Sequence, residues 1–423
     1  MRVGLITAAL CAAIAVGLGG PAAPSRAHAQ ASAPDTYVNY WDGVANQAFT
    51  AAATTPPDGA VISAYVAIAV YDSVLAIEGG YEPFAVDVDA PRGASPEAAV
   101  VAAAHAILVH YLPAQQATIF DPAYQQSLGT IPDGLAKEDG VATGEFVARV
   151  FLRQRANDGF RVPVPYIPPD PPVPGVWIPT APSPPLGTYM PTMTPLSLRQ
   201  PSEFRPGPPP SLSSRRWARD YNEVKEIGSR TSTTRTPEQT LAARFWGEPP
   251  IQQAHGSYRK FITDHGLDIA DASRFMAMTT VVAADALIAC FDAKYHYPFW
   301  RPVTAIPAGD TDGNPDTVAD PSWLPLLPAT PNHPEYPSAH SCLTPATGLV
   351  IARFLGTREI DFTIPSLTGL GERHYDRVSD LEYEVTNARI WGGIHYRTSV
   401  EVGTDIAKKV ERQVLADHFH RSR

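Results

Sequence analysis

Apolar residues recur at spacings of three and four positions along much of the chain, which is the pattern of helices that bury one face. The segments that carry this pattern are rich in Ala, Leu, Glu, Arg and Gln, which are strong helix formers. We find no sustained alternation of apolar and polar positions, the pattern of a half-buried strand, so the sequence predicts an all-α fold. The predicted helices cover residues 58–79, 95–113, 137–158, 215–228, 237–264, 271–295 and 400–420.

Two features indicate that these helices form a folded core. Ser95-Pro96-Glu97 and Thr236-Pro237-Glu238 each put a capping residue before a proline at the first helical position, as helix starts prefer. The two most apolar helices each contain an acid, Asp72 in one and Asp285 in the other. No charge-free apolar run of about 18 residues therefore follows residue 29, and we expect a helical bundle without a membrane span.

The chain changes character between Pro163 and Pro210, where 18 of its 44 prolines lie. Such a stretch favours an extended, polyproline-like conformation. It also carries apolar residues such as Trp177 and Tyr189, so we expect it to wrap over the helical body, although a mobile spacer would have the same proline content. The chain then divides into a signal peptide (1–29), an N-terminal helical half (30–162), a proline-rich connecting segment (163–214) and a C-terminal helical half that carries the chemistry (215–423).

The first 29 residues have the pattern of a secretory signal peptide. A basic residue at position 2 precedes an apolar stretch, and Ala27-His28-Ala29 is an A-x-A cleavage pattern. We expect cleavage after Ala29 and a secreted or periplasmic location. Cys290 and Cys342 remain after cleavage, and an oxidising compartment would permit either a disulfide or two buried thiols.

The charge composition excludes one class of partner. The chain has 33 basic and 43 acidic residues, a net charge of −10. A nucleic-acid footprint needs a clustered basic surface, so we expect no nucleic-acid partner. The charge says nothing about the oligomeric state.

Three short segments carry polar residues in unusual settings, and the first is Lys294-Tyr-His-Tyr-Pro-Phe-Trp-Arg301-Pro302. Pro298 must end the preceding helix, because an interior proline costs about 3 kcal/mol. Lys294 then lies in the last helical turn and Arg301 in an extended stretch beyond it. An ammonium and a planar guanidinium together suit an oxyanion. Taken alone, two surface cations near a helix C-terminus would explain the segment equally well.

The second segment, Pro337-Ser338-Ala339-His340, predicts the start of a helix over residues 339–355 with Ser338 as its N-cap. The free N–H groups of a helix start and a serine hydroxyl form a ready anion site. His340, in the first turn, could exchange protons with a bound anion. Pro345 inside this helix indicates a bent or shifted start. A capped helix with an incidental histidine is the alternative.

The third segment runs from Asn387 to Ser399 and contains Arg389 and His395. Six residues correspond to about 120° on an ideal helix, so the two side chains would not share a face of one continuous helix. Gly392-Gly393 allows the backbone to break between them and to turn both inward. A neutral imidazole near guanidinium groups is suited to act as a ligand or as a nucleophile.

Together the segments resemble the signature Lys-x6-Arg-Pro, Pro-Ser-Gly-His and Ser-Arg-x5-His-x3-Asp of the vanadium-dependent haloperoxidases. The same signature occurs in their relatives, the type 2 phosphatidic acid phosphatases and the class A bacterial acid phosphatases. The resemblance covers roughly residues 270–410 and implies a helical bundle that binds vanadate, with phosphate as a competing oxyanion. It implies that His395 bonds to the vanadium or phosphorus atom and that His340 is the acid–base group, with Lys294 also catalytic. The groups that would hold the oxygens are Lys294, Arg301, Ser338, the backbone N–H of Ala339, and Arg389.

The chain departs from this signature at three positions. Ala339 replaces the glycine, which a backbone N–H contact tolerates if φ is negative. Ala388 replaces the serine before the arginine. Ser399 stands where the family usually has Asp, so the group that orients the histidine must differ, and Glu401 is a substitute only if the last helix starts later.

Two further positions bear on the halide. By the resemblance, His333 occupies a pocket position where fungal chloroperoxidases carry Phe and algal bromoperoxidases carry His, which favours bromide; a histidine held by the proline-rich loop is the alternative. We also place Trp300 in the halide pocket. Nearby, Asp310-Thr-Asp-Gly-Asn-Pro-Asp316 lacks the glycine and the final Glu of an EF-hand loop, so it predicts Asx turns rather than a calcium site.

The resemblance leaves three functions open, because one oxyanion site serves more than one chemistry. The preferred one is oxidation of halide by hydrogen peroxide with bound vanadate, bromide being preferred and an organic molecule accepting the halogen. The alternative is a secreted acid phosphatase that cleaves phosphate monoesters through a phospho-histidine. The third is a helical binding module without catalytic activity.

Overall fold

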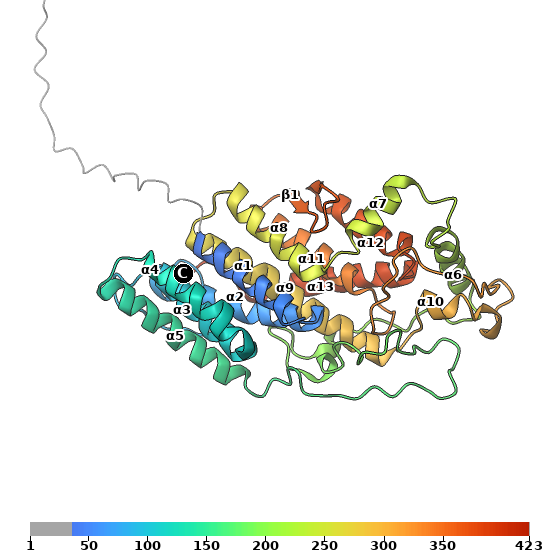
Figure 1. Ribbon diagram of the computed structural model, residues 1–423, viewed down its shortest axis with the longest axis horizontal. Coiled ribbons are helices and arrows are strands. Elements are labelled where there is room, and N and C mark those ends of the chain that lie inside the picture. The colour runs from blue at the N-terminus through green and yellow to red at the C-terminus, as the bar shows by residue number, and fades with distance from the viewer. Residues whose placement is uncertain (1–35, 423) are drawn as a thin grey trace, which may run out of the picture. The chain divides into compact units, whose positions relative to one another are not determined.

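Helices account for almost all of the regular structure in residues 36–422, the part of the chain that the computed structural model describes (Figure 1). The predicted signal peptide and its cleavage site lie outside these residues. In the first part of the chain the helices are α1 (Thr36–Ala51), α2 (Pro56–Glu78), α3 (Pro96–Tyr111), α4 (Asp121–Gly129) and α5 (Leu135–Arg155). In the second part they are α6 (Arg215–Ile227), α7 (Pro237–Phe245), α8 (Pro250–Asp264), α9 (Ile269–His296), α10 (Pro302–Ala305), α11 (Ala339–Leu355), α12 (Val378–Trp391) and α13 (Arg397–Asp417).

The predicted helix starts are confirmed by their caps. The hydroxyls of Ser95 and Thr236 accept the N–H groups of residues three positions on, and Thr236 forms a reciprocal capping box with Gln239. The single helix predicted over 237–264 is wrong, because Pro249-Pro250 divides it into α7 and α8. The helix predicted over 339–355 is confirmed at both ends, with Pro345 inside it.

A short antiparallel hairpin corrects the all-α prediction in one place. Strands β1 (Glu359–Pro365) and β2 (Glu372–Arg377) pair between α11 and α12. The side chains of β1 alternate, with Ile360, Phe362 and Ile364 on the buried side. This alternation is too brief to stand out among helical patterns. The all-α class is otherwise confirmed.

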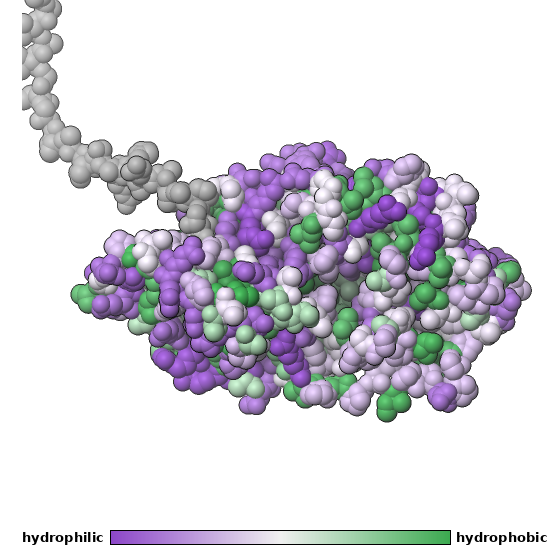
Figure 2. Space-filling model, in the orientation of Figure 1, coloured by the Kyte–Doolittle hydropathy of each residue, from purple (hydrophilic) through white to green (hydrophobic). Residues whose placement is uncertain are grey.

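The core is built around the two most apolar helices, α2 and α9, which pack against each other. Helix α2 also packs on α3, which lies beside α5, whereas α9 also packs on α11 and α13 (Figure 1). By length and composition both α2 and α9 could cross a membrane, and α3 with the bent segment after it could form a third span. In this fold 89% of the apolar window of α2 and 94% of that of α9 are buried. On the face drawn in Figure 2, hydrophilic side chains predominate and apolar ones are scattered.

The proline-rich segment lies against the helical body, as predicted. Its residues form two short 3₁₀ turns, Met190–Thr192 and Pro201–Phe204, and otherwise extended chain. Trp177 is fully buried, and its backbone N–H donates to the carbonyl of Pro298 at 2.6 Å. Leu186 N donates to Asn332 O at 2.9 Å. The segment is therefore tied to the loops on either side of the candidate site.

Candidate active site

Three segments far apart in the sequence converge on one place: the end of α9 with the stretch after it, the start of α11, and the turn between α12 and α13. The turn depends on Gly393, which has a φ of 76°. A Cβ there would lie 2.4 Å from the carbonyl oxygen of Gly228, so only glycine fits. Helix α12 ends at Trp391 and α13 begins at Arg397. The predicted break therefore exists, and it lets Arg389 and His395 approach the same site.

His395 is held by a buried carboxylate. Its Nδ1–H donates to Oε1 of Glu335 at 2.8 Å, and both residues are almost completely inaccessible to solvent. Burial, together with the positive charges of Arg301 and Lys294, lowers the pKa of His395 well below its ordinary value. The imidazole is therefore neutral, with its proton on Nδ1 and a lone pair on Nε2.

Glu335 is the site residue that the sequence reading missed. Its two oxygens accept hydrogen bonds from His395, from the backbone N–H of Tyr396 at 3.0 Å and from the hydroxyl of Ser399 at 2.7 Å. Ser399 thus binds the carboxylate that takes the place of the family's Asp. Burial raises the pKa of Glu335 to about 7, while Arg301 and these donors oppose the shift.

Glu401 is not the substitute for that Asp. Helix α13 does not start later than expected, and Glu401 instead pairs with Arg216 at 3.1 Å on the surface. Glu335 precedes Ser338 by three residues, on the proline-rich entry to α11. An acid in a proline-rich loop belongs to no helical or strand pattern that would mark it as buried. Its contact with His395 is visible only in the folded structure.

Arg301 joins the two loops that form the floor of the site. Its Nε donates to the carbonyl of His333, and its Nη1 donates to the carbonyl of Ile394, both at 3.0 Å. Nη1 also reaches Nε2 of His395 at 3.2 Å, and Nη2 reaches Nδ1 of His333 at 3.0 Å. The guanidinium is fully buried, and burial lowers its pKa to about 10.

Lys294 differs from the prediction in what it touches. Its ammonium group donates to the backbone carbonyls of Pro334 at 2.8 Å, Glu335 at 3.0 Å and Pro337 at 2.5 Å. All three of its protons are used, and it lies behind the cavity wall rather than in it. Lys294 therefore holds the loop that precedes α11 in place, and its positive charge acts on the cavity through the wall. Burial lowers its pKa to about 8.

Arg389 and the start of α11 carry polar groups without partners. The Arg389 side chain is buried, its Nη1 donates to the carbonyl of Trp246, and its Nε has no hydrogen-bond partner in the described chain. The buried hydroxyl of Ser338 also lacks a partner, and no side chain caps the N-terminus of α11. A buried polar group without a partner costs about 1–3 kcal/mol, so such groups mark a place for a ligand.

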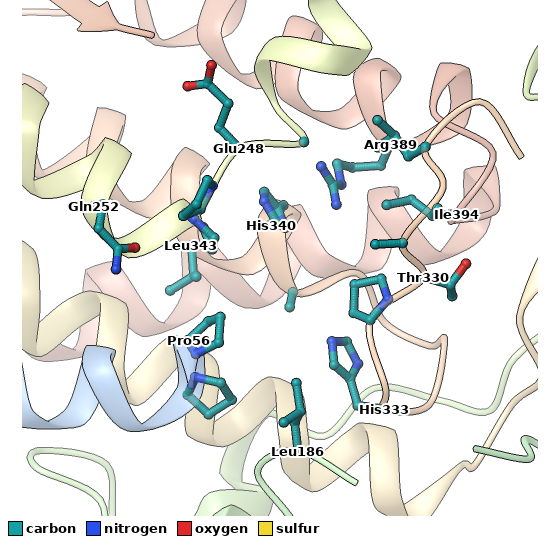
Figure 3. Close-up of a pocket in the computed structure, with 18 of the residues that line it drawn as sticks. Pro56, Leu186, Glu248, Gln252, Thr330, His333, His340, Leu343, Arg389 and Ile394 are labelled. Carbon is teal, nitrogen blue, oxygen red and sulfur yellow. The ribbon is translucent and has the colours of Figure 1, made fainter. Parts of the chain in front are cut away.

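Arg389 and the first turn of α11 line a cavity of about 850 Å³, whereas Ser338 and Arg301 are not among the residues of its lining. Its lining includes His333, Ala339, His340, Arg389 and His395. Figure 3 shows the side chains of His340 and Arg389 pointing toward each other across one wall, with His333 on the opposite side. Burial and the nearby guanidinium and ammonium groups lower the pKa of both His340 and His333 well below the ordinary value. Both imidazoles are thus neutral near pH 7.

Trp300 does not lie where the sequence reading put it. It packs in a second cluster of aromatic side chains, with its ring 5.9 Å from that of Trp217, and it is absent from the cavity lining. We therefore remove Trp300 from the halide pocket. His333 lines the cavity, as a halide-pocket residue would. It is also hydrogen-bonded to Arg301 and to its own loop, so the geometry is compatible with both predicted roles.

Two other predictions are resolved nearby. Cys290 and Cys342 are free, buried thiols rather than a disulfide. In the acidic loop, Asp312 Oδ1 accepts Asn314 N at 2.8 Å and Asn314 Oδ1 accepts Asp316 N at 3.0 Å. These are the Asx turns that the sequence predicted.

The charges of the site do not cancel. Lys294, Arg301 and Arg389 are all buried, and within residues 36–422 none of them forms an ion pair within 4.0 Å. Among the described residues, Glu335 is the one carboxylate in direct contact with His395. No cluster of three or more His, Cys, Asp or Glu side chains suited to a bare metal ion occurs in this part of the chain. The arrangement suits a multiply charged oxyanion beside one neutral imidazole.

The comparisons with known proteins bear on the fold and on the C-terminal part of the chain. Residues 274–421 match the family model of the VCPO second helical-bundle domain. Vanadium chloroperoxidase of Curvularia inaequalis is 26% identical, in a match that spans 69% of this chain and 63% of that protein's length. A crystal structure described as the first bacterial vanadium-dependent iodoperoxidase superposes with a TM-score of 0.79 at 24% identity, covering 92% of this chain and 97% of that one. A holo-type bacterial vanadium-dependent chloroperoxidase gives 0.70 at 20% identity, covering 90% and 97%.

Fold and site together define a helical-bundle protein with a cation-rich cavity between three segments of its C-terminal part. The matched family model and the relatives above support a place for this chain in the vanadium haloperoxidase superfamily.

Proposed function

We propose that the protein is a vanadate-dependent haloperoxidase that oxidises halide with hydrogen peroxide, bromide in preference to chloride. The observation that carries the proposal is the uncompensated buried charge, three cations against one carboxylate around a neutral His395. Without a ligand this arrangement is unfavourable, because buried charges need partners. A bound oxyanion would supply them.

The available groups fit vanadate. Arg389, the Ser338 hydroxyl and the open N–H groups at Ala339 would hold its oxygens, with Arg301 and Lys294 contributing charge from behind the wall. Nε2 of His395, which accepts an N–H of Arg301 at 3.2 Å, carries the lone pair that a ligand atom would meet in place of that guanidinium. Bound vanadate would supply the Lewis-acid centre that activates peroxide toward halide.

His340 is suited to proton transfer. It lines the cavity on the first turn of α11, and its pKa is lowered well below the ordinary value. A neutral imidazole can take a proton from incoming hydrogen peroxide and return it to a leaving oxygen. We assign this role to His340 and the positioning of His395 to Glu335.

The bromide preference rests on His333. Ser399, in the position of the family's Asp, gives no reason to expect weak activation of peroxide, because Glu335 provides a carboxylate for His395. His333 makes one wall of the cavity polar, where a phenylalanine would make it apolar. The relatives' names include both chloroperoxidase and iodoperoxidase, so they do not select a halide for this chain. We also propose export of the protein, on the signal-peptide pattern of residues 1–29.

The test is thermal unfolding with and without orthovanadate. Binding to the folded state alone should stabilise it by RT ln(1 + [L]/Kd), about 2.7 kcal/mol at a hundredfold excess over Kd, and phosphate should compete. Arg389→Ala should abolish the shift, whereas Arg216→Ala, on the surface, should keep it. No shift with either oxyanion would refute the site.

Turnover then distinguishes the reactions. Monochlorodimedone should be brominated with vanadate and peroxide far faster than it is chlorinated, and His333→Phe should narrow the difference. Equal rates for the two halides in the wild type would refute the bromide preference. Hydrolysis of a phosphate monoester without any halide oxidation would identify the protein as an acid phosphatase instead.

A further inference from the structure

His340 borders a second, much smaller cavity in addition to the main one. The smaller cavity measures about 40 Å³, and its lining includes His340, Thr344 and Thr347 of α11 with His255 and Tyr258 of α8. Positions 340, 344 and 347 share one face of the helix, because they are three or four residues apart. His340 therefore lies between the main cavity, where the anion would bind, and a small internal cavity beside α8.

Both histidines of the small cavity have ring nitrogens that the fold leaves without a partner. Within residues 36–422, neither ring nitrogen of His340 forms a hydrogen bond, and Nε2 of His255 forms none. Buried polar groups normally bond to protein or to ordered water. One buried water needs about 10–15 Å³, so the cavity would hold about two or three. The hydroxyls of Tyr258 and Thr347, which bond to each other at 2.8 Å, offer water further polar contacts.

The other ring nitrogen of His255 is held by a carboxylate from α1. Nδ1 of His255 lies 2.5 Å from Oδ1 of Asp42. Oδ2 of Asp42 accepts an N–H of Arg259 and, at 3.3 Å, the amide of Asn46. Burial alone would raise the pKa of Asp42, but His255 and Arg259 together lower it below its ordinary value. An ionised carboxylate only accepts hydrogen bonds, so Nδ1 of His255 carries a proton, and a neutral ring keeps its lone pair on Nε2.

We propose that Asp42 and His255 are positioning residues, which set the tautomer of His340 through water in the small cavity. The water would donate to Nε2 of His255 and accept the N–H of His340 that faces it, and two waters in a row would keep the same direction. His340 would then present its lone pair to the main cavity. That tautomer is the one that can take a proton from hydrogen peroxide. The proposal rests on the proposed function, which makes His340 the acid–base group.

A purely structural role for the Asp42–His255 pair is the alternative. The pair connects α1 to α8, and these two helices pack together (Figure 1). A structural pair needs only a hydrogen bond between the two side chains, whichever of them donates it. An array that sets the tautomer of His340 depends on which nitrogen of His255 carries the proton. A substitution that keeps the hydrogen bond and reverses its direction therefore distinguishes the two roles.

Asp42→Asn makes this reversal. The amide oxygen must face the donors of Arg259 and Asn46, so the amide N–H group faces His255, whose Nδ1 must then accept. In nitrogen-15 NMR of the vanadate-free protein, we expect the proton of His255 to move to Nε2 and that of His340 to move to its other ring nitrogen. The signals are assigned with His255→Gln and His340→Gln. Turnover should fall about 10–100-fold, less than the 10²–10⁴-fold of an acid–base group itself, with the vanadate Kd unchanged.

Asp121→Asn is the matched control. Oδ1 of Asp121 lies 2.9 Å from Nε2 of His105, and neither residue lines the main or the small cavity. This variant should leave the tautomer of His340 and the turnover unchanged. Ala283→Val tests the water itself, because its two added methyl groups would occupy the small cavity. There His255 should keep its tautomer while His340 loses its preference for one, and this result remains decisive if Asp42→Asn fails to fold.

An unchanged tautomer of His340 in Asp42→Asn or in Ala283→Val would overturn the proposal, and so would the same response to Asp121→Asn. Turnover that falls in Asp42→Asn without a change in the His340 signals would assign the pair a structural role. The NMR spectra are recorded without vanadate and peroxide, and the vanadate-induced thermal shift is measured separately. Failure of the positioning array and failure of the proposed function therefore give different results.

Discussion

The two central helices, α2 and α9, each carry a buried aspartate whose hydrogen bonds the fold completes, whereas the site beyond them holds buried cations without an ion pair in the described chain. Asp72 on α2 is buried, and its oxygens accept the backbone N–H groups of Phe84, Ala85 and Val86. Asp285 on α9 is buried in the same way, and it accepts the N–H groups of Leu196, Ser197 and Leu198. Nine residues after Asp285 on α9, Lys294 lies beside Arg301 and Arg389, and these three buried cations form no ion pair within the described chain.

The difference between the two aspartates and the site's cations distinguishes groups that stabilise the fold from groups that bind a ligand. The two aspartates tie loops to the core, and every bond that they need is already made within the protein. At the site, Arg389 Nε and Ser338 Oγ have no partner, and the first turn of α11 has no cap. A buried charge that the fold satisfies stabilises the fold, whereas one that the fold leaves unsatisfied indicates a ligand. The following predictions test this contrast.

The largest effects are expected for the two histidines of the site. His395→Ala should abolish both oxyanion binding and turnover, because the imidazole that meets the anion is lost. His340→Ala should leave vanadate bound and lower turnover by about 10²–10⁴-fold, the usual contribution of an acid–base group. Isothermal titration with vanadate and the bromination rate give the two readouts. If His340→Ala loses vanadate while His395→Ala keeps it, the two roles are reversed.

The aspartates should behave in the opposite way. Asp72→Ala or Asp285→Ala leaves three loop N–H groups without an acceptor, and each such group costs about 1–3 kcal/mol if it stays buried. We expect the free energy of unfolding in urea to fall by about 3 kcal/mol in each variant, with the vanadate Kd unchanged. Asp87→Ala, an exposed acid in the same loop as the Asp72 partners, should change stability by less than about 0.5 kcal/mol. A weakened vanadate Kd in either aspartate variant would contradict the division.

Glu335 is both a structural and a functional residue. Its hydrogen bonds are completed within the fold, and it also positions His395. Glu335→Gln keeps most of the hydrogen-bonding shape but removes the charge that holds His395. Partners of this kind are typically worth 10–100-fold in affinity or activity, so vanadate affinity should fall by that factor. Ser399→Ala removes one neutral hydrogen bond to the same carboxylate and should cost only about fivefold. Equal losses of vanadate affinity in the two variants would show that the negative charge of Glu335 does not determine the affinity.

Much of this could be predicted from the sequence, and the failures have physical causes. Helix starts were predictable because caps such as Ser95 and Thr236 act locally. Lys294, Arg301, Arg389 and His395 converge as expected, because prolines and glycines fix where the helices end. Glu335 and the position of Trp300 were not predictable, since each depends on which surface a loop meets after folding. The short hairpin at β1 was hidden because three alternating apolar residues are too few to distinguish a strand from a loop.

The last prediction is a pH dependence that comes from Lys294. Burial lowers the pKa of this ammonium group to about 8, below the lowered pKa of about 9 for Arg389 and about 10 for Arg301, and guanidinium groups keep their proton in proteins. Sulfate keeps its charge in this range, so its affinity should fall above about pH 8 by up to about tenfold per pH unit, because binding then requires a proton. The stability of the anion-free protein should change with pH in the opposite direction to the sulfate affinity. Between about pH 8 and 9.5 the unfolded chain binds more protons at this lysine than the folded chain, so stability should rise with pH. Lys294→Gln should remove both slopes, and a sulfate affinity with the same pH slope in both proteins would assign the effect to another group.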